Sequence, residues 1–302
     1  MAGVHPSSAS SPLRGDGRPV VVLGEFDGFH LGHRQLVDAA AQLARLQGRP
    51  IVGVVLDDPG AERVLTSVEE RCWALLACGV GSAIAITFTE PDDPAAGAQA
   101  VDEIVARFDP VAIVTACLPG NPDAARYPAL RAECERRGMT MVEVPRWLNP
   151  DGSLITTARI RDALAGGDVV RATDWLGRRF SLTGTVVHGS GLGRTIGFPT
   201  ANLDLPANQF VPMNGVYAAL VELADGDERR AAVNIGVRPT VEEHGKLVVE
   251  AHLLDFDGDL YDQRITVAFR RWLRDEHRFE SIDALVTQLA TDIRQIRLLL
   301  RH

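Results

Sequence analysis

The chain has 302 residues, of which 46% are apolar and 24% are charged, and its formal net charge is −9. This composition is typical of a globular protein with one large domain or two ordinary ones. The acidic balance argues against general nucleic-acid binding, which needs a basic surface to neutralise phosphates. No apolar run is long enough to span a bilayer, so we expect no membrane partner either.

The N-terminus and the cysteines suggest no chemistry of their own. Residues 1–18 are rich in serine, proline and glycine and lack an apolar core stretch. We therefore expect a disordered tail rather than a signal peptide. The cysteines show no CxxC pair and no metal-ligand spacing, so we expect small buried thiols in a reducing cytoplasm. They are Cys72, Cys78, Cys117 and Cys134.

Apolar runs alternate with helical patterns from residue 19 to residue 145. The predicted strands are 19–26, 50–56, 82–88, 111–116 and 139–145, and the predicted helices are 31–48, 66–79, 101–108 and 122–138. Strands that alternate with helices predict an α/β domain with a doubly wound parallel sheet, which binds ligands at the carboxyl ends of its strands. Two short helices, 156–167 and 168–177, complete a predicted domain of residues 19–178.

The pattern changes after residue 180. Strand-like segments follow one another at 181–189, 215–223, 229–236, 246–256 and 263–273. Consecutive short strands separated by turns predict an all-β antiparallel barrel or sandwich. Ser281 is expected to cap a closing helix over residues 282–300. The second predicted domain therefore covers residues 179–302.

The stretch GEFDGFHLGH, residues 24–33, follows the first predicted strand directly. A helix N-terminus offers unpaired N–H groups to phosphate, and Gly28 and Gly32 let the backbone approach a ligand closely. His30 and His33 share one helix face. Their imidazoles could donate hydrogen bonds to triphosphate oxygens and stabilise the charge that develops as pyrophosphate leaves. The alternative is a strand–helix turn with incidental histidines.

FDGFHLGH resembles the HxGH signature of the nucleotidylyltransferase superfamily, in particular the FMN adenylyltransferase module of bacterial bifunctional riboflavin kinase/FAD synthetases. ITTARIR, residues 155–161, resembles the second signature of that superfamily. The resemblance implies adenylyl transfer from ATP to FMN with His30 and His33 as catalytic residues. The ATP-binding residues that it implies are Gly24, Phe26, Asp27, Gly28, Thr156, Thr157 and Arg161.

A second glycine-rich stretch, GSGLGRTIGFPTAN, spans residues 189–202. Its glycines suit a loop that cradles phosphates, and Arg194 adds a fixed positive charge. It contains no GK[ST] and so is not a Walker A loop. Thr200 and Asn202 offer hard oxygen ligands for Mg²⁺ beside ATP phosphates. The alternative is a glycine-rich hairpin with a proline turn.

The full string closely resembles the signature of riboflavin kinases, and the resemblance continues in order through residues 180–302. It implies phosphoryl transfer from ATP to riboflavin, with Glu250 as the catalytic base and with Thr200 and Asn202 as metal ligands. The implied ATP-binding residues are Gly189, Gly191, Gly193, Arg194, Gly197, Pro199 and Thr200. The implied flavin-binding residues are Arg274, Glu276 and Phe279.

The sequence therefore predicts a two-domain flavin-cofactor enzyme that uses riboflavin, FMN and ATP with Mg²⁺. Two segments depart from the family pattern: LDDPGAERV (56–64) replaces a longer Pro-His-Pro segment, and TACLPGNPDAARYPAL (115–130) replaces a GxDFxFG flap. One alternative is a kinase whose first domain is inactive for FAD synthesis, and another is a first domain that uses a different acceptor. A third is a flavin-binding sensor without catalysis. Self-association stays open.

Overall fold

The computed structural model describes residues 17–88, 93–117, 128–145, 148, 149, 152, 154–189, 191–238 and 246–301. The chain divides into two compact units, residues 1–157 and 158–302. Residues 1–16 of the expected tail lie outside the described residues. The domain boundary near residue 178 lies further along the chain than this division and stays a prediction.

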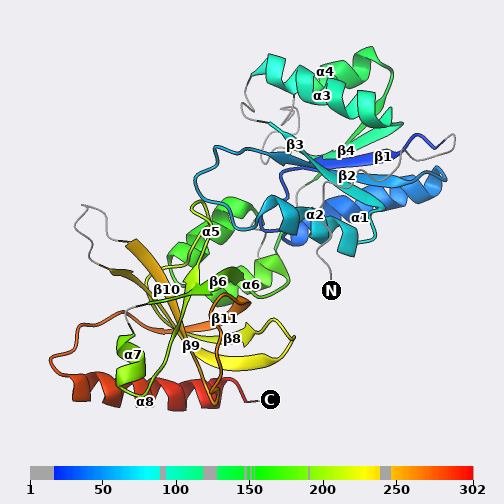
Figure 1. The fold of residues 1–302 in the computed structure, drawn as a ribbon. Helices are drawn as coiled ribbons and strands as arrows, with labels where there is room; N and C mark the ends of the chain where they lie inside the picture. Colours follow the sequence, from blue (N-terminus) through cyan, green and yellow to red (C-terminus); the bar gives the residue numbers. More distant parts are fainter. Residues whose placement is uncertain are drawn as a thin grey trace. The chain divides into compact units, whose positions relative to one another are not determined.

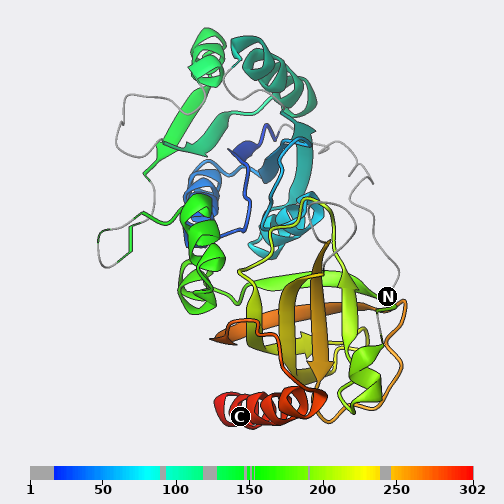
Figure 2. The same ribbon diagram turned by 90° about the vertical axis from the view of Figure 1, so that its left-hand side faces the viewer.

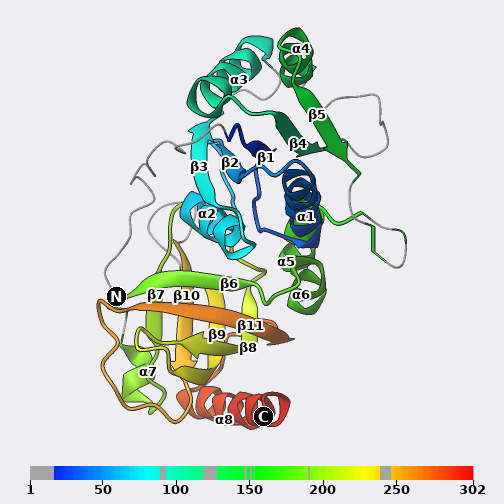
Figure 3. The same cartoon turned by 90° about the vertical axis from the view of Figure 1, so that its right-hand side faces the viewer.

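The first unit is a five-stranded parallel sheet with the strand order β3-β2-β1-β4-β5. Helices α1 and α2 cover one face and α3 and α4 the other (Figure 3). The doubly wound α/β fold is thereby confirmed. The elements are β1 (Val20–Gly24), α1 (Leu31–Leu46), β2 (Ile51–Asp57), α2 (Val68–Ala77), β3 (Ser82–Thr87), α3 (Pro94–Phe108), β4 (Ala112–Ala116), α4 (Pro128–Arg136) and β5 (Thr140–Val144).

The central strand β1 explains why an unbroken apolar run stands at its place in the sequence. Val20, Val21 and Val22 are fully buried because the sheet is covered on both faces. The strand ends at Gly24, two residues earlier than predicted. The chain then turns sharply into α1, so the first candidate site lies at the carboxyl end of the central strand.

Helix α3 begins at Pro94, seven residues earlier than the predicted helix 101–108. Asp93 caps it, since the Asp93 carboxylate accepts a hydrogen bond from Ala95 N at 2.9 Å. The first turns carry alanine and glycine without apolar periodicity. The sequence pattern therefore could not show the early start.

The second unit is a closed antiparallel barrel with the strand order β10-β7-β6-β11-β8-β9. Figure 1 labels all of these strands except β7, which is labelled in Figure 3. Closure pairs each of these six described strands with a neighbour on both sides. The predicted barrel and its closing helix are confirmed. The elements are α5 (Thr157–Ala165), α6 (Val169–Leu176), β6 (Ser181–Val187), α7 (Leu192–Thr195), β7 (Ala201–Asp204), β8 (Gly215–Glu222), β9 (Glu228–Arg238), β10 (Lys246–Leu253), β11 (Arg264–Arg274) and α8 (Ile282–Leu299).

Helix α8 lies across one end of the barrel (Figure 2). Ile296 and Leu300 pack against Ala218 of β8 and Ala232 of β9. Ser281 caps the helix as predicted, because its hydroxyl accepts a hydrogen bond from Ala284 N at 3.1 Å. Among the described residues no helix is long and apolar enough to cross a membrane.

Candidate active sites

The turn between β1 and α1 has an unusual backbone. Phe26 and Phe29 have φ angles of 53° and 40°, and Gly28 has a φ of 77°. Bulky residues rarely adopt this left-handed region, and such strain gathers at functional sites. Both phenylalanine rings are buried in the core between the sheet and α1. Their burial helps to hold the strained turn.

The turn brings His30 and His33 together. Their rings stack with centroids 3.7 Å apart and an angle of 14° between the planes. His30 caps α1, because its Nδ1 accepts a hydrogen bond from His33 N at 3.3 Å. An accepting Nδ1 carries no proton, so the proton of neutral His30 sits on Nε2. Nε2 is therefore the atom with which His30 can donate to a ligand.

Asp27 points inward and anchors the turn. Its Oδ1 accepts hydrogen bonds from Leu65 N at 2.8 Å and from Thr66 N at 3.0 Å. Gly28 N in turn donates to Thr66 Oγ1 at 2.8 Å. The Asp27 carboxylate is buried, and its bonds tie the turn to the loop before α2. The sequence analysis predicted Asp27 as an ATP-binding residue but did not predict a role for Thr66 at this site. The sequence marks Thr66 only as the residue before Ser67, which caps α2.

The second predicted signature reaches the same turn. Thr157 Oγ1 donates to the backbone oxygen of Asp27 at 3.0 Å. This bond occupies the hydroxyl proton of Thr157, and Thr156 directly precedes it in the chain. Arg161 lies one helical turn later on α5 and belongs to the second unit. Gly24 ends β1, where an added Cβ would make only ordinary contact with the Phe26 ring at 3.5 Å.

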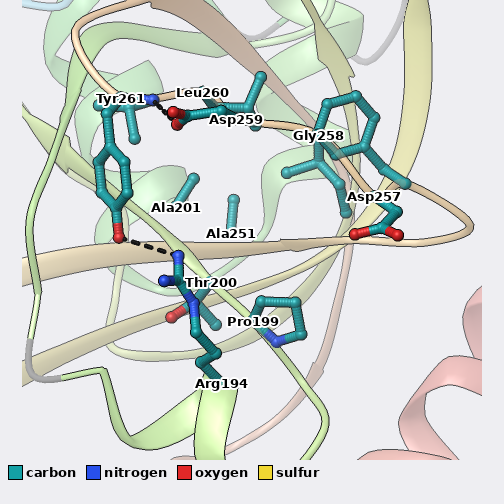
Figure 4. A pocket seen from close by; sticks show the side chains of 13 residues that line it. Arg194, Pro199, Thr200, Ala201, Ala251, Asp257, Gly258, Asp259, Leu260 and Tyr261 are labelled. Atoms are coloured by element: carbon teal, nitrogen blue, oxygen red, sulfur yellow. Dashed lines mark hydrogen bonds between the residues drawn. The ribbon is translucent and has the colours of Figure 1, made fainter.

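The barrel carries the second site, a cavity of about 580 Å³ (Figure 4). Its lining includes Arg194, Pro199 and Thr200 from the glycine-rich stretch. The Arg194 guanidinium donates to Tyr261 Oη at 3.3 Å, and the Tyr261 backbone N donates to Asp259 at 3.0 Å. A fixed cation thus stands beside the hydroxyl of Thr200 in a cavity large enough for a nucleotide.

The glycine-rich stretch contains elements that sequence analysis did not predict. The one-turn helix α7 lies inside it, and the four-residue strand β7 begins at Ala201. Both are too short to show a period in the sequence. Gly193 must lack a side chain, because its Cβ would lie 2.3 Å from Phe198 O. Gly191 and Gly197 have φ angles of 74° and 85°, which glycine tolerates best.

Strand register places the proposed base between two amides. Glu250 of β10 pairs with Asn202 of β7 on one side and with Asn234 of β9 on the other. Directly opposed residues on antiparallel strands stand with their Cβ atoms about 4.5–5.5 Å apart. The structure thus brings two predicted residues together and adds Asn234. The sequence could have pointed to Asn234 only through the stretch AAVNIGVRPTV, residues 231–241, which lies within the segment that resembles riboflavin kinases.

Of the three predicted flavin residues, Arg274 ends β11, and Glu276 and Phe279 follow it. Arg274 is held by Asp292 of α8, with NH2 2.8 Å from Oδ2, and its guanidinium carbon lies 5.8 Å from the centre of the Phe279 ring. Glu276 accepts a hydrogen bond from Asn234 Nδ2 at 3.4 Å. The segment 274–279 is therefore linked both to α8 and to the strand beside Glu250.

The donor set around Thr200 and Asn202 suits Mg²⁺ bound together with a nucleotide. The described residues contain no cluster of three or more histidine, cysteine, aspartate or glutamate side chains that could hold a metal alone. A hydroxyl and an amide carbonyl are neutral hard ligands. Mg²⁺ in kinase sites keeps several waters and takes much of its coordination from substrate phosphates. Two such protein ligands therefore fit a metal that arrives with ATP.

Comparison with known proteins adds two family matches. Residues 14–146 match a family model described as FAD synthetase, and residues 176–300 match one described as riboflavin kinase. The bifunctional riboflavin kinase/FMN adenylyltransferase of Pseudomonas fluorescens is 34% identical over 93% of this chain and 92% of its own length. The enzyme of the same description from Escherichia coli K12 is 33% identical over 97% of this chain and 95% of its own.

A solved structure has the same fold over nearly the whole chain. It is that of a Streptococcus pneumoniae protein described as a macrolide-efflux protein, with a TM-score of 0.77 and 29% identity. The match covers 94% of this chain and 95% of that one. The arrangement of a parallel-sheet unit followed by a barrel unit is thus shared with an experimental structure.

Proposed function

The chain belongs to the family of bifunctional riboflavin kinases/FMN adenylyltransferases, and we propose how its residues carry the two reactions. The barrel unit phosphorylates riboflavin to FMN, and the parallel-sheet unit joins FMN to an adenylyl group to give FAD. The observation that carries this function is that one chain matches both family models in order. It favours the bifunctional enzyme over a kinase alone and over a sensor.

For the kinase reaction, we infer that Glu250 accepts the proton of the ribityl 5′-hydroxyl. The oxygen attacks the γ-phosphorus of ATP, and ADP leaves. The strand register supports this role, because Glu250 stands between Asn202 and Asn234 and both amides can orient its carboxylate. Thr200 and Asn202 would hold Mg²⁺, which when bound neutralises charge on the phosphates. Arg194, with Pro199 beside it and the glycines Gly189, Gly191, Gly193 and Gly197 around it, would bind the phosphates of ATP.

For adenylyl transfer, a phosphate oxygen of FMN attacks the α-phosphorus of ATP and pyrophosphate leaves. His30 and His33 would donate hydrogen bonds to the triphosphate as its charge grows. The N-terminus of α1 offers further N–H donors. Thr156 is proposed as an additional phosphate donor, and the role of Arg161, which belongs to the second unit, stays a sequence prediction. Asp27 and Thr157 serve the site by bonding to the turn itself.

For riboflavin binding, we infer that the segment 274–279 covers the ring system. Phe279 offers an apolar face. Glu276 accepts a hydrogen bond from Asn234, which stands opposite Glu250 in the strand register. Arg274 is engaged by Asp292, so its contribution is to hold the segment in place. The cytoplasmic location and any self-association stay predictions.

A product assay tests the two activities separately. The protein is incubated with riboflavin, ATP and Mg²⁺, or with FMN, ATP and Mg²⁺, and the flavins are separated by chromatography. We expect FMN and then FAD from riboflavin, and FAD from FMN. Glu250→Gln should abolish FMN formation and leave FAD formation from FMN intact, and the double variant His30→Ala/His33→Ala should do the reverse.

Two outcomes would contradict the proposal. If FMN accumulates and no FAD forms even from supplied FMN, the first unit has lost FAD synthesis or uses another acceptor. If Glu250→Gln forms FMN at the rate of the unsubstituted protein, Glu250 is not the base.

A further inference from the structure

The turn that carries His30 needs support from outside itself. Phe26 and Phe29 lie in the left-handed region, where strain persists only if the surroundings over-determine the backbone. The support comes from the loop before α2, through the bonds of Leu65 and Thr66 to Asp27. The position of the His30 and His33 imidazoles therefore depends on the contacts that hold this loop against the turn.

Arg71 of α2 bridges the loop and the turn. Its side chain is only 5% exposed. Nε donates to Thr66 O at 3.1 Å, NH1 donates to Glu25 O at 3.4 Å, and NH2 donates to Asp27 Oδ1 at 3.4 Å. One planar guanidinium thus binds the turn at two points and the loop at a third.

Helix α2 does not need Arg71 to form. A capping box joins Ser67 and Glu70 at its N-terminus, with Ser67 N donating to Glu70 Oε2 at 2.7 Å. Its apolar face is held by Cys72 and Leu75 in the core. The buried pair of Arg71 and Asp27 as a whole adds little net stability, although removing the guanidinium alone costs stability because the buried Asp27 carboxylate loses this counter-charge. The three directed bonds of Arg71 instead specify the geometry of the turn.

Asp57 supports the same arrangement. It ends β2 at the carboxyl edge of the sheet, and its Oδ1 lies 3.9 Å from Arg71 NH1. Burial raises the pKa of Asp57, and Arg71 opposes this rise by favouring the ionised carboxylate. Arg71 therefore faces carboxylates on both the turn and the neighbouring strand, which keeps its charge compensated.

We propose that Arg71 is a positioning residue for adenylyl transfer, which holds the Glu25–Asp27 backbone so that His30 and His33 meet the triphosphate. The inference rests on the FAD synthesis proposed for the first unit. A positioning role and a purely structural role predict different effects of substituting Arg71. Loss of the guanidinium should lower the rate of the chemical step while the unit stays folded and still binds ATP.

The test compares Arg71→Lys and Arg71→Met with the unsubstituted full chain. Lysine keeps the charge but cannot make the three directed bonds, and a displacement of catalytic groups by about 1 Å can cost on the order of a hundredfold in rate. We expect kcat for FAD formation from FMN to fall at least about tenfold in both variants, with KM for ATP within about threefold. FMN formation by the barrel unit of the same molecules should stay unchanged.

Ile104→Val is the matched control. Ile104 is fully buried in the core on the opposite face of the sheet, so the substitution removes one methyl group without touching the turn. Urea unfolding of the first unit is measured for every variant. If Arg71→Lys loses FAD formation only as far as an equally destabilised Ile104→Val does, the positioning role is overturned.

A spectroscopic measurement separates this inference from the proposed function. Imidazole nitrogen and proton signals of His30 and His33 are assigned by NMR with single-histidine variants. We expect these signals to shift in Arg71→Lys and to stay unchanged in Ile104→Val. Unchanged signals in Arg71→Lys would overturn the inference whether or not the protein makes FAD, whereas absence of FAD from the unsubstituted protein would overturn the proposed function.

Discussion

At the scale of single residues, Gly189 lacks a side chain and thereby leaves space for the side chain of Asn202. A Cβ at this position would lie 2.3 Å from Asn202 Nδ2 and 2.6 Å from Asn202 Cγ. Both atoms belong to a side chain that can rotate away, so the backbone need not move. The Asn202 amide occupies the space left by Gly189, and Asn202 stands opposite Glu250 in the strand register.

Gly189→Ala should therefore damage the kinase more than the fold. We expect FMN formation to fall about tenfold or more, which corresponds to about 1.4 kcal/mol, because Asn202 leaves its position. FAD formation from supplied FMN should not change. Gly166→Ala is the control, since its Cβ would make only ordinary contacts, the nearest at 3.5 Å. Equal FMN formation by both variants would show that the position of Asn202 does not matter.

The buried cysteines allow a prediction about pH. Burial raises the pKa of the Cys134 thiol to about 11, and burial also raises the pKa of Cys72. Because a raised pKa favours the neutral thiol, only about one Cys134 thiol in a thousand is ionised at pH 8. We expect Cys72 and Cys134 to resist a thiol reagent at pH 8 in the folded protein and all four cysteines to react in guanidinium chloride. Rapid labelling of Cys134 in the folded protein would contradict this assignment.

At the scale of elements, the sequence predicts what is local and misses what depends on packing. Buried runs such as 19–26 mark strands because a covered parallel sheet needs apolar residues on both faces. The alignment of Asn202, Glu250 and Asn234 could not be predicted, since register across a barrel is decided by distant turns. The pair Arg274–Asp292 was likewise missed, because it exists only once α8 docks on the barrel.

That pair yields a prediction for α8. The Asp292 side chain is 2% exposed, and it also accepts a hydrogen bond from Gln288 Nε2 at 2.7 Å. Asp292→Asn leaves the partly buried guanidinium without its counter-charge, which costs about 3–5 kcal/mol in comparable pairs. We expect lower stability of the barrel unit and a raised KM for riboflavin, because segment 274–279 loosens. Arg297→Gln, which breaks the exposed pair with Asp255, is the control and should change neither by much.

At the scale of the whole molecule, an acidic protein handles anionic substrates. The formal net charge is −9, and both ATP and FMN are negatively charged. Local hydrogen-bond donors and cations must therefore attract the anionic substrates, because the overall charge does not. In the barrel unit Arg194 lines the cavity beside Thr200, and in the sheet unit the imidazoles stand at the N-terminus of α1. Each unit supplies its own donors and its own catalytic side chains.

Because each proposed site lies within one unit, we expect FMN to pass between the sites through solution. The kinase residues come from residues 158–302 and the stacked imidazoles from residues 1–157. Labelled riboflavin is supplied to the enzyme together with an excess of unlabelled FMN. Free exchange dilutes the label in FAD in proportion to the added FMN, and FAD appears after a lag. A label that stays high in FAD would contradict this expectation and mean direct transfer of FMN between the sites. In that case FAD would form more slowly from an equimolar mixture of Glu250→Gln and His30→Ala/His33→Ala proteins than from the intact enzyme at equal activity of each site.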